Sequence, residues 1–345
     1  MTGCKATGRG GGIYASLPAS TAGSPLVFAP NLTLVNNNAG SDGGGAYVQV
    51  AAGTVELFSW TATSNNAGSS GGGVAVTAEG VFVNQSTFQS NIATGSGGGL
   101  FVNASRAAIS SSALEDNGAG VYGAALALVN NNCTLSSTRV VGNVAHLLGP
   151  AIFSFDPNDG LPQVDPSCLV GNNTGGPCAV SPFATWPRSV SAAARLSAYV
   201  AASSSVTFSV KLVDGYGHMV CGPAAVDNYK ASLVLSSGLS VTPSTYASSE
   251  TPFALQYGSV ALYSGAAFSG LNGNYSVVIA ADGVPQVSND TMSIGFVLES
   301  CSPACAAGAC VGGPYQVTCT ACTNHFHGRN CDVCYPGTVD RFFWG

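Results

Sequence analysis

An asparagine recurs along the first half of the chain at a nearly constant interval. Successive members of the series are 28, 26, 26 and 26 residues apart, and a triplet of small residues follows each of them, beginning with Gly43-Gly44-Gly45. A fixed internal period of this kind is typical of solenoids, in which each repeat buries its apolar face against the next. The members of the series are Asn37, Asn65, Asn91, Asn117 and Asn143.

Apolar residues keep a fixed phase relative to these asparagines. They lie ten and eight residues before and nine and eleven residues after each one, as do Val81, Val83, Leu100 and Val102 around Asn91. Residues two positions apart share one face of a strand but not of a helix. We therefore expect about three short strands in each repeat, separated by turns rich in Gly, Asn and Ser.

Such repeats predict a parallel β-helix. Coils stacked about 4.8 Å apart pair as parallel strands, and the apolar columns then form continuous ladders inside. The asparagines are expected to stack at one turn and to hydrogen-bond from coil to coil. Because the apolar columns stay in phase, the alternative of a disordered low-complexity tract is disfavoured. We predict an all-β chain in which residues 1–155 form a right-handed parallel β-helix.

The repeat resembles those of the polymorphic outer membrane proteins and related pectin-lyase-like β-helices. Phe88-Gln89-Ser90-Asn91 matches their Phe-x-x-Asn motif. Gly98-Gly99-Leu100 and Gly44-Gly45-Ala46 loosely match their Gly-Gly-Ala-Ile/Leu/Val motif. The likeness covers about residues 10–155 and implies a secreted or surface-exposed adhesive solenoid, without implying a particular chemistry.

Few residues carry charge. Lys, Arg, Asp and Glu make up 8% of the chain, where about 25% is usual, and the net charge is −6. With three lysines, the chain offers no basic face for nucleic acid. No apolar run approaches the ~18 residues that a membrane-spanning segment needs. The sequence thus predicts no nucleic-acid partner, and membrane anchoring only through segments outside this chain.

Cysteines and glycosylation sequons indicate an oxidising compartment. The chain has 12 cysteines, concentrated near its end, and seven Asn-x-Ser/Thr sequons. The sequence opens without a signal-peptide core, and its first repeat starts part-way through a coil, with Cys4 at the asparagine position. We therefore expect a disulfide-bonded glycoprotein, cut from a longer extracellular or cell-surface chain. The sequons are Asn31, Asn84, Asn103, Asn132, Asn172, Asn274 and Asn289.

The repeat weakens after Ser154, and residues 156–184 are predicted to form a linker or cap. Residues 156–160 are rich in turn formers. Cys168 and Cys178 bracket a glycine-rich step. A local disulfide between these two is one hypothesis, although spacing alone cannot establish the pairing.

Residues 185–299 are predicted to form an antiparallel β-sandwich. Apolar and polar residues alternate strictly over 206–212, and similar stretches follow at 231–235, 275–279 and 292–298. Residues 210–217 and 273–277 resemble two segments of filamin-type immunoglobulin-like domains, which implies a spacer or adhesion module. We expect Asp214 to cap a turn rather than to bind a metal ion.

Residues 300–345 form a cysteine-rich tail with the spacing C-x3-C-x4-C-x8-C-x2-C-x8-C-x2-C. This spacing resembles a truncated laminin-type EGF-like module. The resemblance implies the disulfides Cys301–Cys310, Cys305–Cys319 and Cys322–Cys331, and leaves Cys334 without its partner. The competing hypothesis is a zinc site built from the last four cysteines, with His325 and His327 between them, which a reducing compartment would favour.

No arrangement of residues predicts catalysis. Polysaccharide lyases and hydrolases on β-helices need clustered carboxylates with basic residues on the same face. The carboxylates of the repeat stand at different offsets from the asparagines, and Arg106, Arg139 and His146 are isolated in the sequence. Cys133 falls in an apolar column and is expected to be a buried thiol. We predict a chain that is not an enzyme and needs no cofactor or metal ion. The carboxylates concerned are Asp42, Glu56, Glu79, Glu115 and Asp116.

The sequence thus favours a structural or adhesive protein that presents a low-charge face to extracellular glycans or proteins. Tyr47, Trp60 and Tyr122 are expected to be exposed and could stack on sugar rings, although isolated surface aromatics are common. Two alternatives stay open. One is a carbohydrate-active β-helix enzyme whose active coils lie outside this sequence, and the other is a receptor ectodomain.

Overall fold

The computed structural model describes residues 1–18, 26–27, 29–129, 132–155, 161–176, 181–194, 199–201, 205–220, 230–245, 251–252, 260–269, 273–282, 291–299, 310–312, 317–319, 326–327 and 333–334. The chain divides into two compact units. Unit 1 comprises Met1–Arg188, Val213–Ala224 and Gln256–Gly258. Unit 2 comprises Ser189–Leu212, Ala225–Leu255 and Ser259–Gly345.

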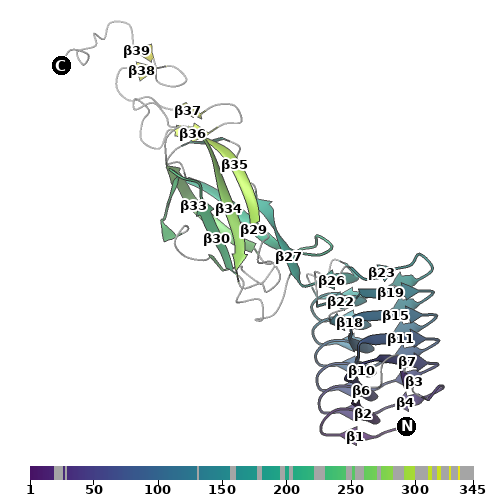
Figure 1. Ribbon diagram of the computed structural model, residues 1–345. Helices are drawn as coiled ribbons and strands as arrows, with labels where there is room; N and C mark the ends of the chain where they lie inside the picture. The colour runs from purple at the N-terminus through teal and green to yellow at the C-terminus, as the bar shows by residue number, and fades with distance from the viewer. Residues whose placement is uncertain are drawn as a thin grey trace. The chain divides into compact units, whose positions relative to one another are not determined.

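Unit 1 is a parallel β-solenoid, seen in Figure 1 as a stack of similar coils. A full coil contributes one strand to each of four parallel sheets, which have seven, seven, six and six strands in the part of the chain that the structure describes. The first sheet contains β1 (Lys5–Ala6), β5 (Asn38–Ala39), β9 (Asn66–Ala67), β13 (Ile92–Ala93), β17 (Gly118–Ala119), β21 (Val144–Ala145) and β25 (Thr174–Gly175). The second contains β2 (Ile13–Leu17), β6 (Ala46–Val50), β10 (Val74–Thr77), β14 (Leu100–Asn103), β18 (Leu126–Val129), β22 (Ile152–Ser154) and β26 (Phe183–Thr185).

The other two sheets complete the coils. The third sheet contains β3 (Leu26–Val27), β7 (Thr54–Phe58), β11 (Gly80–Asn84), β15 (Arg106–Ser110), β19 (Asn132–Ser136) and β23 (Gln163–Val164). The fourth contains β4 (Thr33–Val35), β8 (Thr61–Thr63), β12 (Thr87–Gln89), β16 (Ala113–Glu115), β20 (Arg139–Val141) and β24 (Leu169–Gly171). The parallel β-solenoid predicted from the repeat is therefore confirmed.

The apolar columns of the sequence are the core of the solenoid. Neighbouring coils pair in register, so that Val74 lies beside Leu100 in the second sheet and Phe88 beside Leu114 in the fourth. These four side chains are completely buried. Because each inward side chain stacks on its equivalent in the next coil, the core is continuous along the solenoid.

Two details of the solenoid differ from the sequence-based expectation. Each full coil has four strands rather than three, because a two-residue strand such as β13 follows each asparagine and is too short to show a period. The solenoid also extends past residue 155, since β23 to β26 pair with β19 to β22. The described strands between residues 163 and 185 thus form a further coil within the segment predicted to be a linker or cap. The interval between the last two asparagines of the stack lengthens to 30 residues, which put this coil out of phase with the repeat.

Close contact between coils explains the small-residue triplet. A Cβ atom on Gly72 would lie 2.4 Å from the carbonyl oxygen of Gly98 in the next coil. Gly71 has a φ of 71°, which is costly for residues with a side chain. Glycine is therefore favoured at these two positions of this coil by the backbone itself.

A turn at residues 214–218 covers the last coil of unit 1. One carboxylate oxygen of Asp214 accepts the backbone N–H groups of Tyr216 and His218, at 2.9 and 2.8 Å. The other accepts the N–H of Thr185, at 3.2 Å. Burial raises the pKa of Asp214, and these three N–H groups oppose that rise. Asp214 therefore caps a turn, as expected.

Unit 2 contains two sheets that pack face to face. One has the order β27 (Pro187–Ala194), β29 (Ser205–Asp214), β33 (Val260–Ser269) and β31 (Ser240–Thr242). The other has the order β28 (Tyr199–Ala201), β35 (Thr291–Glu299), β34 (Gly273–Asp282), β30 (Lys230–Leu235) and β32 (Thr251–Pro252). The rings of Phe268 and Phe296 meet between the sheets with centroids 5.1 Å apart. The pairings fit the predicted antiparallel sandwich, except that β28 joins β35 in parallel.

Two short hairpins lie in the cysteine-rich tail. β36 (Cys310–Gly312) pairs with β37 (Val317–Cys319), and β38 (Phe326–His327) pairs with β39 (Val333–Cys334). The backbone register places Cys310 opposite Cys319. The other cysteines of this tail, Cys301, Cys305, Cys322 and Cys331, lie outside the described residues.

Candidate ligand-binding face

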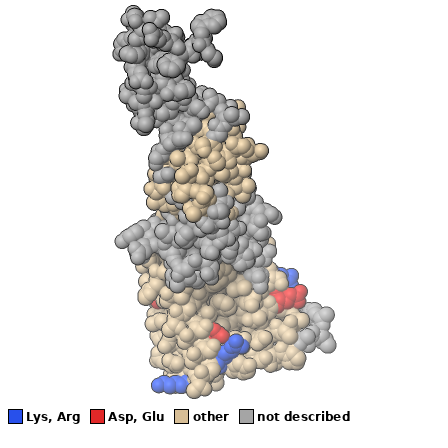
Figure 2. Space-filling view, turned by 90° about the vertical axis from the view of Figure 1, so that its left-hand side faces the viewer, with Lys and Arg blue, Asp and Glu red and all other residues tan. Residues whose placement is uncertain are grey.

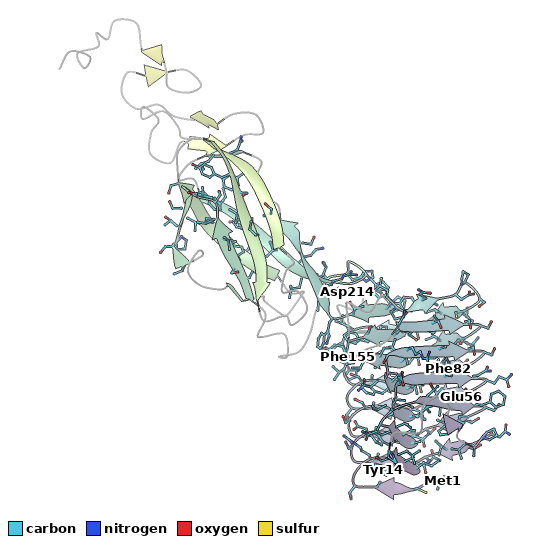
Figure 3. All side chains as sticks on the ribbon, in the orientation of Figure 1. Met1, Tyr14, Glu56, Phe82, Phe155 and Asp214 are labelled. Atoms are coloured by element: carbon cyan, nitrogen blue, oxygen red, sulfur yellow. The ribbon has the colours of Figure 1, made fainter. Side chains whose placement is uncertain are left out.

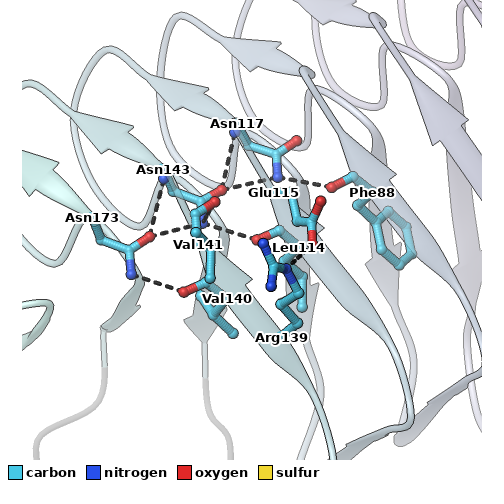
Figure 4. A network of polar contacts seen from close by, with 9 residues as sticks. All are labelled: Phe88, Leu114, Glu115, Asn117, Arg139, Val140, Val141, Asn143 and Asn173. Carbon is cyan, nitrogen blue, oxygen red and sulfur yellow. Dashed lines mark hydrogen bonds and ion pairs between the residues drawn. The ribbon is translucent and has the colours of Figure 1, made fainter. Parts of the chain in front are cut away.

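The repeated asparagines form a buried hydrogen-bonded ladder inside the solenoid (Figure 4). The side-chain oxygen of Asn143 accepts both the backbone N–H and the side-chain amide of Asn117, each at 3.0 Å. The same amide nitrogen also donates to the carbonyl oxygen of Phe88, at 2.9 Å. Because these buried amides have protein partners, they hold the coils together rather than await a ligand. The same pair of bonds joins Asn37 to Asn65, Asn65 to Asn91 and Asn91 to Asn117.

The ladder is longer than the sequence analysis proposed. At one end the backbone N–H of Cys4 donates to the side-chain oxygen of Asn37, at 3.0 Å. At the other end Asn143 donates its backbone and side-chain N–H groups to Asn173, at 3.0 and 2.9 Å. The repeat period does not predict Asn173 as a member of the ladder, because it follows Asn143 by 30 residues instead of 26.

A second buried column carries hydroxyl groups five residues before Asn91, Asn117 and Asn143. The hydroxyl oxygen of Ser86 accepts the backbone N–H of Trp60, and that of Ser112 accepts the N–H of Ser86, at 3.0 and 3.1 Å. Thr138 continues the column and donates to a carbonyl oxygen at 2.9 Å. The constant offset was present in the sequence and could have revealed this column.

The three aromatic residues that we expected to be exposed are buried. Tyr47, Trp60 and Tyr122 are 7%, 0% and 4% exposed. Trp60 occupies the inward-facing hydroxyl column, and the two tyrosines are covered by neighbouring rings. The prediction was therefore wrong, because Trp60 faces the core and the two outward-facing tyrosines pack against other aromatic rings.

One such cluster lies on the outer face of the second sheet, toward its C-terminal end. The ring of Tyr122 stacks on Phe153, with centroids 4.3 Å apart, and Trp186 meets both rings edge-on. Phe155, labelled in Figure 3, packs against all three. Because the rings cover one another, we infer that this cluster stabilises the sheet by packing.

A second cluster lies on the same face, at β2 and β6. Tyr14 pairs in register with Tyr47, and their rings stack with centroids 5.6 Å apart and planes 9° apart. Tyr14 is 58% exposed, in contrast to Tyr47 beneath it. Figure 3 labels Tyr14 near the N-terminal end of the stack. Tyr14 lies on the first strand of this sheet in the given sequence, and its ring contacts Tyr47 of the following coil.

Polar groups fix the buried ring of this pair. The guanidinium group of Arg9 lies 4.7 Å from the Tyr47 ring centroid and donates to its hydroxyl oxygen, at 3.1 Å. The Tyr47 hydroxyl in turn donates to the side-chain oxygen of Gln49, at 3.1 Å. Arg9 also forms an ion pair with Asp42, with 3.0 Å between Nε and Oδ2. Burial raises the pKa of Tyr47, although Arg9 opposes the rise, so its hydroxyl stays protonated at neutral pH.

A signal for this cluster is present in the sequence. Cys4 takes the asparagine position of the first coil, 33 residues before Asn37. Arg9 lies as many residues after Cys4 as Asp42 lies after Asn37. Tyr14 and Tyr47 are likewise equally far from Cys4 and Asn37. Extending the columns by one coil would have predicted both pairs. We name Arg9, Tyr14, Asp42, Tyr47 and Gln49 the Tyr14 cluster.

The remaining charged residues of the solenoid do not converge. Glu115 forms an ion pair with Arg139 in the next coil, which corrects the expectation that Arg139 is isolated (Figure 4). Arg106 lies over the ring of Phe82, 5.9 Å from its centroid, on the third sheet. Figure 3 labels Glu56 near Phe82, away from Tyr14. Among the described residues, no group of three or more His, Cys, Asp and Glu side chains is placed to hold a metal ion.

The described cysteines of unit 1 are free thiols. Cys133 is completely buried, and burial raises its pKa to about 12. Cys168 is partly buried and free, whereas Cys178 lies outside the described residues, so their pairing stays a prediction. The disulfides of the tail and the alternative zinc site also stay predictions.

The sequons differ in exposure. Asn31, Asn132, Asn172 and Asn274 are exposed, Asn84 and Asn103 are half-buried, and Asn289 lies outside the described residues. A search of the described residues finds no helix that is long and apolar enough to cross a membrane.

These features define unit 1 as a parallel β-solenoid with an aromatic and polar cluster on one lateral face. No protein-family model matches the chain, and no curated protein matches it. Among solved structures, the crystal structure of the S-layer protein SbsC domains 4 and 5 aligns with 13% sequence identity and a TM-score of 0.20. The alignment covers 35% of this chain and 56% of that chain. A likeness this low carries no argument about fold or function.

Proposed function

We propose that this chain is a structural and adhesive module of an extracellular or cell-surface protein, without enzymatic activity. The observation that carries the proposal is the continuous stack of coils that the buried asparagine ladder holds together, with few charged side chains on its described surface in Figure 2. A rigid stack of this kind presents a preformed face, which loses little entropy when a partner binds to it. Glycans or proteins outside the cell are the proposed partners.

The character of the surrounding surface supports this proposal. Figure 2 looks at the left-hand side of Figure 1 and shows few charged side chains on the described residues. A surface with little charge suits neutral partners rather than nucleic acid. The carboxylates of the solenoid are separated or paired with arginine, which does not favour the acid and base pair that glycoside hydrolysis requires.

The same proposal includes the domain type of each part of the chain. The likeness of the repeat motifs to pectin-lyase-like and polymorphic outer membrane β-helices supports a right-handed adhesive solenoid. The segments that resemble a filamin-type domain suggest that unit 2 is an immunoglobulin-like spacer. The cysteine spacing of residues 300–345 suggests a laminin-type EGF-like module with the disulfides named above. All three favour a location outside the cell, where disulfides persist.

The proposal can be tested with the complete chain, produced in a secretory host. Labelled protein is applied to an array of neutral and acidic glycans and to intact cells treated with periodate or with protease. Saturable binding to either surface, without release of new reducing ends from polysaccharides, supports an adhesive module. Release of reducing ends, or the absence of saturable binding to both surfaces, would overturn the proposal.

A further inference from the structure

Two phenylalanine rings on the outer face of the third sheet are only partly covered. Phe58 on β7 is 39% exposed, and Phe82 on β11, labelled in Figure 3, is 36% exposed. Both strands lie inside the stack, since β7 pairs with β3 and β11, and β11 pairs with β7 and β15. Because described coils lie on either side of both strands, the exposure of these rings does not depend on an end of the stack.

A glycosylation sequon places its asparagine beside both rings. Asn84 follows Phe82 by two residues, so the two side chains share the outer face of β11. In the parallel register Asn84 pairs with Phe58 of the preceding coil, and neighbouring strands lie about 4.8 Å apart. Its partner in the following coil is the small residue Ser110. A group attached to Asn84 therefore has one ring within reach along the strand and another across the sheet.

Arg106 approaches Phe82 from the side that is turned away from Asn84. Its guanidinium group lies 5.9 Å from the ring centroid of Phe82. Its side chain passes over Gly80, its partner in register, because a Cβ atom at Gly80 would lie 3.1 Å from Nε of Arg106. Gly80 and Asn84 stand two residues before and two residues after Phe82 on the same face of β11. The side of the ring toward Asn84 is therefore left for an attached group.

We propose that Asn84 carries an N-linked glycan whose first N-acetylglucosamine covers the rings of Phe82 and Phe58. The C–H groups of this sugar pack on apolar surface that otherwise faces water, so the glycan stabilises the solenoid. The inference rests on the proposed extracellular function, and it gives one of the seven sequons a structural role.

The modification precedes the closing of the coil. The side-chain nitrogen of Asn84 forms a bond to C1 of N-acetylglucosamine in a lipid-diphosphate-linked oligosaccharide. The bond from C1 to the diphosphate oxygen breaks, the lipid diphosphate leaves, and the amide gives up one proton. The transfer takes place on the extended chain, so the serine of the sequon is accessible at that stage. In the folded solenoid Ser86 is buried and donates to the carbonyl oxygen of Asn84, at 2.9 Å.

A second sequon offers an instructive contrast. Asn103 also stands two residues after a phenylalanine, on β14 of the second sheet. The ring of Phe101 is half-buried and meets Phe155 edge-on, with centroids 6.5 Å apart. Asn103 pairs in register with Thr77 and Val129, neither of which is aromatic. The sequence motif is therefore shared, whereas the pair of exposed rings belongs to Asn84.

The first measurement is made on the complete chain from a secretory host that adds high-mannose glycans. Glycopeptide mass spectrometry gives the occupancy of each sequon, and endoglycosidase H then trims every glycan to its first N-acetylglucosamine. We expect Asn84 to be occupied. We also expect NMR contacts between the protons of its sugar and the ring protons of Phe82 and Phe58.

The second measurement is urea unfolding of the trimmed protein. Asn84→Gln should raise the equilibrium constant of unfolding about fivefold, because both rings are uncovered again. Asn132→Gln is the matched control and should change it less than about twofold. Asn132 is an exposed sequon of the same sheet, and its partner in register is Arg106 rather than an aromatic residue. In a chain that carries both Phe58→Ala and Phe82→Ala, Asn84→Gln should have no further effect.

The outcomes separate this inference from the proposed function. An unoccupied Asn84 overturns the inference, as does an occupied Asn84 whose sugar makes no contact with the rings. Equal effects of Asn84→Gln and Asn132→Gln would overturn it as well. In each of these cases the adhesive function stands or falls on the binding of the wild-type protein to glycans and cells, which does not depend on the occupancy of Asn84. Far-UV circular dichroism of each variant verifies that the solenoid is folded.

Discussion

The side-chain oxygen of Asn91 lies 3.0 Å from the backbone nitrogen of Asn65 and 2.9 Å from its side-chain nitrogen. One atom therefore satisfies two donors of the preceding coil. Because Asn91 makes the same two donations to Asn117, the ladder transmits this bonding from coil to coil. A ladder of buried, hydrogen-bonded amides stabilises the fold only while each amide keeps its hydrogen-bond partners.

Replacing a ladder asparagine should destabilise the solenoid. Asn91→Leu leaves two donors of Asn65 and the carbonyl oxygen of Ala62 without their partner. We expect a loss of about 3 kcal/mol in the free energy of unfolding, measured by urea titration. Asn66→Leu is the control, since Asn66 is exposed and pairs with an isoleucine in the next coil. Equal stability of the two variants would contradict the structural role of the ladder.

Adding one methyl group to the small-residue triplet should also be costly. Gly72→Ala places a Cβ atom 2.4 Å from the carbonyl oxygen of Gly98, so the coils must separate locally. We expect a destabilisation of about 3 kcal/mol, measured by thermal and urea unfolding. Gly8→Ala serves for comparison, because a Cβ atom at Gly8 meets nothing within 4 Å. A Gly72→Ala protein as stable as Gly8→Ala would show that the coil contact is softer than described.

Two phenylalanines on consecutive strands of one coil, β11 and β12, should respond differently to truncation. Phe88 is completely buried in the core, whereas Phe82 is 36% exposed on the outer face. Phe88→Ala should lower the free energy of unfolding by about 3–5 kcal/mol. Phe82→Ala should change it by about 1 kcal/mol or less. The two variants are compared in one urea titration series, and similar losses would mean that the inward and outward faces are wrongly assigned.

The buried thiol of Cys133 should make stability depend on alkaline pH. Burial raises its pKa to about 12, whereas a cysteine of the unfolded chain ionises near about 8.5. The thiol's contribution is therefore fully present below about pH 8.5 and is lost as pH rises from there toward about 12. Between these limits the wild type should lose about 1.4 kcal/mol per pH unit more than Cys133→Ala.

The alanine variant is a suitable reference because Ala107 occupies the same column in the preceding coil. All other titrating groups are shared, so they cancel when the two proteins are compared. Unfolding free energies are measured at several values between about pH 8 and about pH 10.5. Parallel curves for the two proteins would show that Cys133 is accessible to solvent.

The core of unit 1 could be predicted because its signal is repeated. Val83 and Leu100 keep their offsets from Asn91 in neighbouring repeats, so a single period identifies inward positions without any alignment. The last coil could not be recognised from this period, because Asn173 follows Asn143 by 30 residues and the apolar residues of the coil are therefore out of phase. Strands such as β13 were missed because two residues cannot display a period.

The candidate site was harder to predict than the fold. Outward positions are not bound to one residue type, and the column that contains Tyr47 holds alanine in the next coil at Ala75. Whether an aromatic ring is exposed there depends on its neighbours across coils. Tyr47 is covered by Tyr14 and Arg9, which lie 33 and 38 residues earlier in the chain. Composition and local periodicity do not contain such pairings.

The unequal spacing of the ladder has a consequence for engineering. Successive members of the ladder are 33, 28, 26 or 30 residues apart. In each case the backbone N–H of one member donates to the side-chain oxygen of the next. Between Asn37 and Asn65, the extra residues fall at the corner that joins the second sheet to the third, where β6 and β7 are connected by a longer link than β10 and β11. The link at that corner can therefore vary in length. The turn that carries the ladder asparagines, in contrast, sets the distance from one coil to the next. A foreign peptide grafted between β10 and β11 should therefore be displayed at a chosen height along the stack without shifting the coils on either side.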